Sequence, residues 1–209
     1  MCGIIGYTGS EDVREVLLDA LELLEYRGYD SAGIALRDEE SGKTEVRKCA
    51  GRVSDLRAIC MSEKVVSQCG IGHTRWATHG GVNDCNAHPH QVGKVTLVHN
   101  GIIENYRELI ADYDLADTLK SETDSEVVAA LLNRFYEWNP EEAIKKTVSK
   151  LKGTFALVIL FEDQKDVIYS TRNVSPIVAT ICKEGAMLAS DLTALCRFTN
   201  RYFVVPEYH

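Results

Sequence analysis

The chain has 209 residues, 45% of them hydrophobic and 26% charged, which is ordinary for one globular domain. Its formal net charge is −8 and neither Lys nor Arg forms a block, so we expect no nucleic-acid-binding or anionic-membrane surface. No apolar run approaches a membrane span, no signal peptide is recognisable, and the seven irregularly spaced cysteines indicate reduced thiols in a cytoplasmic protein.

The first half of the chain opens with a short buried strand over residues 2–8. A helix is predicted from Val13, because apolar residues then recur at helical spacing. Ser10 is its expected N-cap, and Gly28 lies beyond its end. Further strands are predicted over residues 31–37, 44–49, 71–75 and 95–98.

The second half begins with a helical signal. Thr123 and Glu126 have the spacing of a capping box and predict a helix after them. Asn139 followed by Pro140 predicts the start of another helix, which Gly153 is expected to close. Strands are then predicted over residues 154–161, 167–171, 177–182 and 187–190. This order predicts a mixed α and β domain and leaves its layering open.

Cys2 is the candidate nucleophile. A cysteine is more often a small buried hydrophobic residue, but position 2 changes that expectation. If Met1 is removed, Cys2 carries both a thiol and a free α-amine, whose ordinary pKa values are about 8.5 and about 7.7–8.0. One residue then holds a nucleophile and a base near neutral pH. Gly3 and Gly6 leave room beside it for a ligand or a close backbone approach.

Asn100 and Gly101 follow the predicted strand over 95–98 and allow two interpretations. Asn-Gly between apolar runs is a strong hairpin signal, and on local sequence alone the hairpin is preferred. The alternative is an oxyanion hole, in which the Asn100 amide and the Gly101 backbone N–H donate to a developing negative oxygen.

Arg75 and Asp124 are candidates for gripping an α-amino acid at its two ends. The planar fork of Arg75 matches a carboxylate, although an arginine is by default a surface residue. Asp124 could pair with an ammonium group, although an acid in the first turn of a helix also favours the helix dipole.

Cys85, His88 and His90, with His79 nearby, are candidate zinc ligands. Their spacing is not a common one for structural zinc, and no second pair of ligands stands at a usual distance. The preferred interpretation is that these histidines pack and form hydrogen bonds around a loop.

Several stretches together resemble one family. They are residues 1–6 (MCGIIG), 24–33 (LEYRGYDSAG), 73–80 (HTRWATHG), 86–90 (NAHPH), 98–105 (VHNGIIEN) and 121–124 (SETD). In this order they are similar to the glutaminase half of the glucosamine-6-phosphate synthases, also called glutamine–fructose-6-phosphate aminotransferases. These belong to the class II glutamine amidotransferases, and the similarity covers nearly the whole chain.

The resemblance implies an α+β fold, a four-layer αββα sandwich of the N-terminal-nucleophile hydrolase type. It implies that residues 1–209 form a single class II domain that stops before the family's last strands, without the sugar-phosphate isomerase domain that receives the ammonia. The implied substrate is L-glutamine, and no metal or organic cofactor is required. Val174 stands where the family usually has glycine, which puts the shape of that loop in question.

The resemblance also implies roles for individual residues. Cys2 is the expected nucleophile, Asn100 and Gly101 the oxyanion hole, and Arg27 a residue near the nucleophile. The implied substrate-binding residues are Arg75 for the α-carboxylate, Asp124 for the α-ammonium, and Trp76, Thr78 and His79 in a loop that covers the substrate.

Two alternatives remain open on sequence alone. One is a glutaminase domain that feeds a different acceptor, as in asparagine synthetase or amidophosphoribosyltransferase, although the stretches at residues 27–31 and 74–80 argue against both. The other is a non-catalytic regulatory or zinc-binding module with Cys2 buried and with Cys85, His88 and His90 on the metal.

Overall fold

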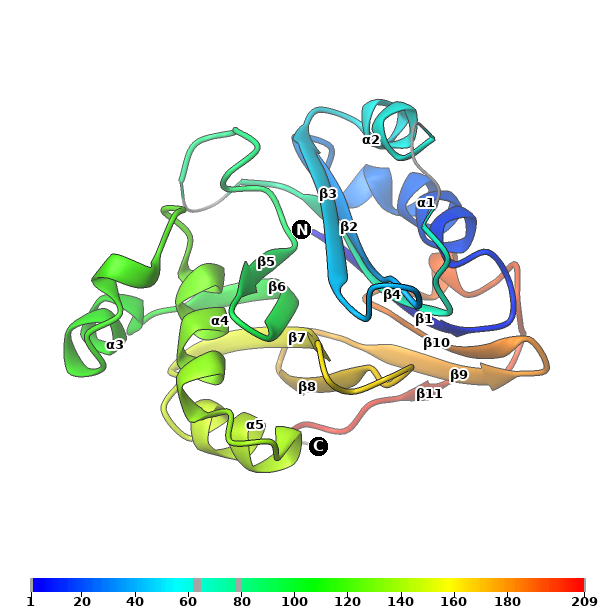
Figure 1. Cartoon of the computed structure of the whole chain (residues 1–209). Helices are drawn as coiled ribbons and strands as arrows, with labels where there is room; N and C mark the ends of the chain where they lie inside the picture. The colour runs from blue at the N-terminus through cyan, green and yellow to red at the C-terminus, as the bar shows by residue number, and fades with distance from the viewer. Residues whose placement is uncertain (1, 62–64, 78–79, 209) are drawn as a thin grey trace.

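The computed structural model describes residues 2–61, 65–77 and 80–208. Two β-sheets face each other between two layers of helices (Figure 1). One outer layer contains α1 (Val13–Leu24) and α2 (Val53–Cys60). The other contains α4 (Asp124–Phe135) and α5 (Pro140–Val148), with α3 (Tyr106–Asp112) beside α4. The architecture is therefore a four-layer αββα sandwich. None of the described helices is long and apolar enough to cross a membrane.

The larger sheet has seven antiparallel strands in the order β11-β9-β10-β1-β4-β2-β3. The first strand of the chain, β1, thus lies in the middle of the sheet. It pairs with β10 on one side and with β4 on the other. The strands are β1 (Gly3–Gly9), β2 (Ser31–Arg37), β3 (Thr44–Ala50), β4 (Cys69–Arg75), β9 (Val178–Cys182), β10 (Gly185–Ala189) and β11 (Phe203–Val204).

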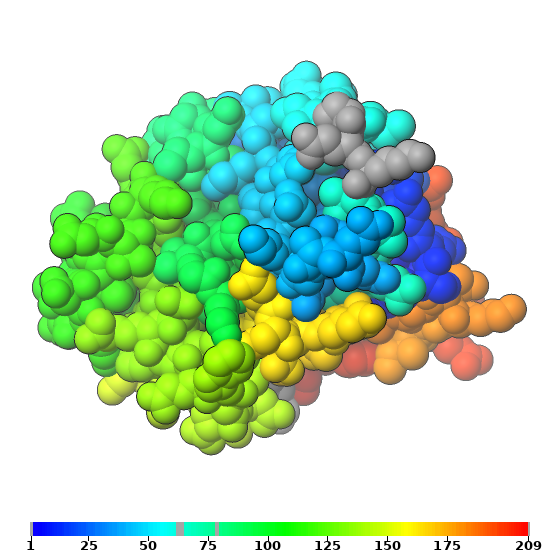
Figure 2. Space-filling model, viewed as in Figure 1, coloured from blue at the N-terminus to red at the C-terminus, as the bar shows by residue number. Residues whose placement is uncertain are grey.

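The smaller sheet has four antiparallel strands in the order β5-β6-β7-β8. They are β5 (His90–Val92), β6 (Val95–Ile103), β7 (Gly153–Phe161) and β8 (Tyr169–Asn173). With all atoms drawn, side chains fill the space between the two sheets on the face shown in Figure 2.

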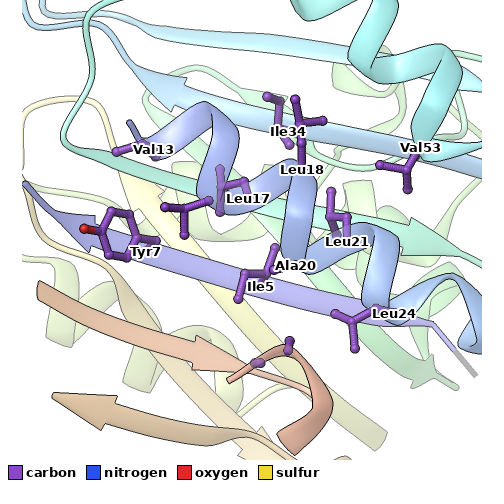
Figure 3. Packing of buried hydrophobic residues seen from close by; sticks show 14 of the residues in the cluster. Ile5, Tyr7, Val13, Leu17, Leu18, Ala20, Leu21, Leu24, Ile34 and Val53 are labelled. Atoms are coloured by element: carbon purple, nitrogen blue, oxygen red, sulfur yellow. The ribbon is translucent and has the colours of Figure 1, made fainter. Parts of the chain in front are cut away.

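Apolar side chains of helix α1 pack on the larger sheet (Figure 3). The approach is close because β4 presents glycines to the helix. A Cβ atom on Gly70 would lie 2.9 Å from side-chain atoms of both Leu17 and Val13. Leu17, Leu21 and other apolar residues of α1 are fully buried against this sheet. The close approach holds β1 and β4 in place: Cys2 immediately precedes β1, and Arg75 is the last residue of β4.

Strand β7 alternates between two hydrophobic cores. Phe155 and Leu157 pack on the helix side, together with α4. Ala156 and Val158 point the other way, into the layer between the sheets. This is the expected behaviour of a strand that is buried on both faces, with side chains alternating along it.

Most predicted strands and the helices beginning near Val13, Asp124 and Pro140 are confirmed, with ends shifted by a few residues. The N-cap of α1 is Asp12 rather than Ser10, since its side chain accepts hydrogen bonds from the first turn. Gly153 does not close a helix, because α5 ends earlier and Gly153 begins β7. Helices α2 and α3 and the short strands β5 and β11 were not predicted.

The preferred hairpin at Asn100-Gly101 is wrong. Strand β6 runs straight through both residues, which pair with Ala156 and Phe155 of β7. The Asn-Gly pair therefore lies inside a strand and does not form a turn.

Candidate active site

Cys2 immediately precedes β1, beside the end of β4. The pairing of Gly3 with Thr74 brings the thiol next to the residues that follow that strand. The backbone N–H of Trp76 donates to Cys2 Sγ over 3.2 Å, and Sγ lies 3.6 Å from the Trp76 carbonyl oxygen. A thiol placed between a donor and an acceptor has a fixed position, as a nucleophile requires.

The carbonyl oxygen of Cys2 is held from two sides. Arg27 Nε and Asn100 Nδ2 each donate to it over 3.0 Å. Arg27 is held in turn by Asp191, whose Oδ2 accepts from Arg27 Nη1 over 2.7 Å and from the Tyr26 hydroxyl over 2.8 Å. The residue that carries the thiol is thus anchored by elements from three distant parts of the chain.

The pKa values around Cys2 follow from burial and nearby charge. Burial raises the pKa of the Cys2 thiol, while the hydrogen bond from Trp76 and the positive charge of Arg75 oppose that rise. Burial also tends to raise the pKa of Asp191, but hydrogen bonds from Thr193 and Tyr26 outweigh it and hold that pKa below its usual range. Asp191 is therefore ionised at neutral pH and can anchor Arg27.

Two pockets flank Cys2. The first has a volume of about 20 Å³, room for one water molecule, so a larger ligand enters only if groups around it move. The second has a volume of about 240 Å³. The first is lined by Cys2, Arg75, Trp76, His88, His99, Gly101, Thr123, Asp124 and Ser125, and the second by Cys2, Arg27, Trp76, Asn100, Gly101, Ile102, Thr154, Ser175 and Pro176.

Arg75 and Asp124 line the first pocket with opposite charges. Arg75 is not a surface residue, because only 4% of it is exposed, and its guanidinium donates to the carbonyls of Gly81 and Gly80 over 3.2 and 3.5 Å. Asp124 is the first residue of α4 and accepts from the backbone N–H of Ile103 over 2.8 Å. A cation and an anion on the wall of one pocket match the two charges of a zwitterion, which the pocket admits only if the groups around it move.

Gly101 could not be replaced by a larger residue in this backbone. Its φ is +130°, in the region that favours glycine, and an added Cβ would lie 2.0 Å from the Thr154 carbonyl oxygen. The glycine lets β6 continue beside β7, and Gly101 lines both pockets beside Cys2.

The structure brings together seven of the nine residues that the sequence singles out: Cys2, Arg27, Arg75, Trp76, Asn100, Gly101 and Asp124. Thr78 and His79 lie outside the described residues. Sequence reasoning missed Asp191, because its one local signal is the cap it forms for the turn at Thr193. It also missed His73, because nothing in the local sequence distinguishes this residue from the rest of the predicted strand.

The loop that raised the zinc question is organised around an ammonium group. Lys48 Nζ, from β3, donates to the backbone carbonyls of Cys85, Ala87 and Pro89 over 3.1, 2.7 and 3.2 Å. His88 is buried, with its ring centroid 4.6 Å from that of His90. Within the described part of the chain, no three Cys, His, Asp or Glu side chains are arranged to hold a metal ion.

The four-layer αββα sandwich is the fold of the N-terminal-nucleophile hydrolases, and in this chain a cysteine immediately precedes the central strand β1. Residues 77–197, more than half of the chain, match the family described as a glutamine amidotransferase domain. The chain belongs to this family, which confirms the resemblance seen in the sequence.

The glutamine–fructose-6-phosphate aminotransferase of Bacillus licheniformis is 48% identical over 206 residues, which cover 97% of this chain and 34% of that protein. The Bacillus subtilis enzyme of the same name is 46% identical over 206 residues, with the same two coverages. The chain therefore spans about a third of the length of these relatives.

Solved structures confirm the fold. The glutamine phosphoribosylpyrophosphate amidotransferase from B. subtilis, complexed with ADP and GMP, matches with a TM-score of 0.84 and 25% identity, over 99% of this chain and 46% of that one. A glutamine aminotransferase class-II domain protein from Silicibacter pomeroyi matches with a TM-score of 0.62 and 17% identity, over 99% and 92% of the two chains.

Proposed function

We propose that this chain hydrolyses L-glutamine to glutamate and ammonia, with Cys2 as the nucleophile. The observation that carries the proposal is the convergence of Arg27 and Asn100 on Cys2, beside a pocket that contains both Arg75 and Asp124. A fixed thiol and a pocket for a zwitterion are what attack on the side chain of an amino acid requires.

We further propose that the ammonia serves the conversion of fructose 6-phosphate to glucosamine 6-phosphate, in an isomerase domain outside these 209 residues. The support is the identity of 46–48% to aminotransferases named for fructose 6-phosphate. The phosphoribosylpyrophosphate amidotransferase, which has a different acceptor in its name, is only 25% identical.

The proposed reaction starts with removal of Met1, which frees the α-amine of Cys2. Because burial raises the pKa of the thiol, a base is needed at neutral pH, and an α-amine with an ordinary pKa of about 7.7–8.0 is suited to that role. The amine takes the thiol proton, through a water molecule, as Sγ forms a bond to the carboxamide carbon of glutamine.

The carbonyl electron pair then moves onto oxygen, and the oxyanion accepts hydrogen bonds from Asn100 Nδ2 and the Gly101 N–H. The ammonium of Cys2 returns the proton to the leaving nitrogen, the C–N bond breaks and ammonia departs. Water attacks the thioester in the same way, which releases glutamate and restores the thiol.

Substrate binding is proposed to use the charges of the first pocket. Arg75 would take the α-carboxylate and Asp124 the α-ammonium. Since the Arg75 guanidinium now donates to the carbonyls of Gly80 and Gly81, a bound carboxylate would compete for the same donors. Occupation of the pocket and the position of this loop are then coupled.

The test uses protein whose loss of Met1 is established by intact mass. Such protein should release glutamate from glutamine, and Cys2→Ala should abolish that release without changing the circular dichroism spectrum. Protein that keeps Met1 should be inactive although folded, because its Cys2 nitrogen is an amide. Full activity in molecules that retain Met1 would rule out the proposed base.

A second measurement separates Cys2 from the other thiols. An electrophilic glutamine analogue should alkylate Cys2 alone, at one equivalent per chain, and excess glutamate should protect it. Cys85 and Cys196 are exposed and serve as internal controls, since a general thiol reagent should modify them while the analogue should not. Equal labelling of all three would argue against a glutamine site at Cys2.

A further inference from the structure

His73 is a polar residue in an apolar layer. It lies in the middle of β4, paired with Ile4 of β1 and Gly33 of β2, and it is completely buried. By the alternation of the strand it shares a face with Ile71, which belongs to the core between the two sheets. Burying an imidazole in such a layer costs free energy unless the ring makes hydrogen bonds there.

The ring of His73 reaches across to the facing sheet. Its Nε2 lies 3.1 Å from the His99 carbonyl oxygen and 3.0 Å from Asn100 Oδ1. A backbone carbonyl can only accept a hydrogen bond, so Nε2 must carry the proton. The atom of Asn100 that faces this N–H must then be an acceptor, which is its amide oxygen.

The other end of the Asn100 amide leads to the same assignment. Asn100 Nδ2 lies 3.0 Å from the Cys2 carbonyl oxygen, which is again an acceptor only. Two independent carbonyls, those of His99 and Cys2, therefore require one orientation of the amide. In that orientation the N–H₂ group points to the residue that carries the nucleophile.

The form of His73 that produces this orientation is the neutral ring with its proton on Nε2. Burial lowers the pKa of His73 to about 3, so the ring stays neutral at working pH. Its other nitrogen, Nδ1, has no hydrogen-bond partner in the described structure, and the ring packs on that of His88 with centroids 4.1 Å apart. Nothing there favours moving the proton from Nε2 to Nδ1.

We infer that His73 is a positioning residue for the glutaminase reaction proposed above: its Nε2–H fixes the Asn100 amide so that Nδ2, and not Oδ1, faces the oxyanion. This inference rests on the proposed function and extends it to a residue that touches neither substrate nor thiol. A reversed amide would place an oxygen lone pair against the developing negative charge. Loss of one oxyanion donor costs about 10²–10³ in kcat.

The kinetic test is a double-mutant cycle. His73→Ala should lower kcat about 10- to 100-fold with KM for glutamine changed less than about threefold, because part of the amide population reverses. His73→Gln should recover most of the loss, since a glutamine amide keeps an N–H near the position of Nε2. In an Asn100→Ala background, His73→Ala should change kcat less than about threefold. The same loss in both backgrounds would overturn the inference.

A measurement on the unaltered protein does not depend on the stability of any variant. With ¹⁵N-labelled histidine, the two ring nitrogens of His73 are distinguished by their chemical shifts, and we expect the neutral form with the proton on Nε2. A proton on Nδ1 would overturn the inference whatever the activity. If the processed protein released no glutamate, the proposed function would fail, while the tautomer would still decide the orientation of Asn100.

Discussion

The ion pair between Arg27 and Asp191 is mostly buried, with side-chain exposures of 8% and 25%. Asp191→Asn would leave the guanidinium without its counter-charge, and the hydrogen bond from Arg27 to the Cys2 carbonyl would lose its fixed geometry. We expect kcat for glutamine hydrolysis to fall about tenfold or more, with KM changed little, because a charged partner of a hydrogen bond contributes roughly 1.5–3 kcal/mol. Steady-state kinetics measure both constants.

Asp19→Asn is the matched control. Asp19 also pairs with an arginine, Arg57, over 2.8 Å, but it lies on α1 and lines neither pocket at Cys2. Its loss should lower stability without lowering kcat. A fall in kcat of the same size in both variants would mean that Asp191 acts through general stability rather than through Arg27.

Asp124→Asn should weaken binding more than turnover. If the carboxylate pairs with the α-ammonium of glutamine in a desolvated pocket, the loss should be roughly 2–5 kcal/mol in kcat/KM. The variant should then process glutamine analogues that lack the α-amine at the same rate as it processes glutamine.

Glu126→Gln tests the specificity of that effect. Glu126 lies in the same first turn of α4, but its carboxylate accepts from the backbone N–H groups of Lys120 and Ser121 and lines no pocket at Cys2. Discrimination against the amine-free analogues should survive in Glu126→Gln. If it survives equally in Asp124→Asn, Asp124 is a helix-start acid only.

Among the connecting elements, the turn after β8 stores strain. Val174 has φ +67°, a left-handed conformation that is an outlier for a β-branched residue, and 63% of its surface is exposed. Val174→Gly would relieve a cost of about 1–3 kcal/mol and lose little packing, against a larger entropy cost of glycine. We expect a net gain of about 1 kcal/mol in the free energy of unfolding, or a rise in Tm of about 2–4 °C.

Asp114→Gly is the control for this turn. Asp114 is exposed and also has a positive φ, +51°, but aspartate tolerates that conformation better than valine does. Its gain in Tm should be smaller. A Val174→Gly protein that melted at a lower temperature than the parent would show that the Val174 side chain contributes more than the strain costs.

At the element scale, periodicity predicted what depends on local sequence. The apolar spacing after Val13 and the Asn139-Pro140 start define helices that bury one face, and these were found. Asn100-Gly101 failed because local sequence favours a turn, whereas pairing with β7 holds both residues in a strand. Asp191 and His73 could not be assigned, since their partners Arg27 and Asn100 are far away in sequence.

For the whole molecule, buried neutral histidines should make stability depend on pH. Burial lowers the pKa of His73 to about 3, and it lowers those of His88 and His90 well below their usual range; the positive charges of Arg75, and of Lys48 beside His90, act in the same direction. In the unfolded chain these rings take up protons below about pH 6.5, while in the folded chain they stay neutral. Protons therefore favour the unfolded state, and stability falls as pH falls below about 6.5.

Urea unfolding at pH 7, 6, 5 and 4 measures this dependence. Each histidine that stays neutral on folding should contribute a loss of about 1.4 kcal/mol per pH unit within its window. His90→Gln should reduce the dependence of the unfolding free energy on pH by about 1.4 kcal/mol per pH unit, whatever its effect on absolute stability. A free energy of unfolding that is flat between pH 6.5 and 5 would contradict the prediction.

The two-faced strand β7 also determines where chain length can vary among homologues of this fold. Removing one residue from its middle would reverse every later side chain, turning Ile159 toward the other sheet and Val158 toward the helices. A two-residue change would keep the faces but shift the pairing with Asn100 and Gly101. Insertions and deletions should therefore gather in turns such as residues 162–168, while β7 keeps its length even where its side chains diverge.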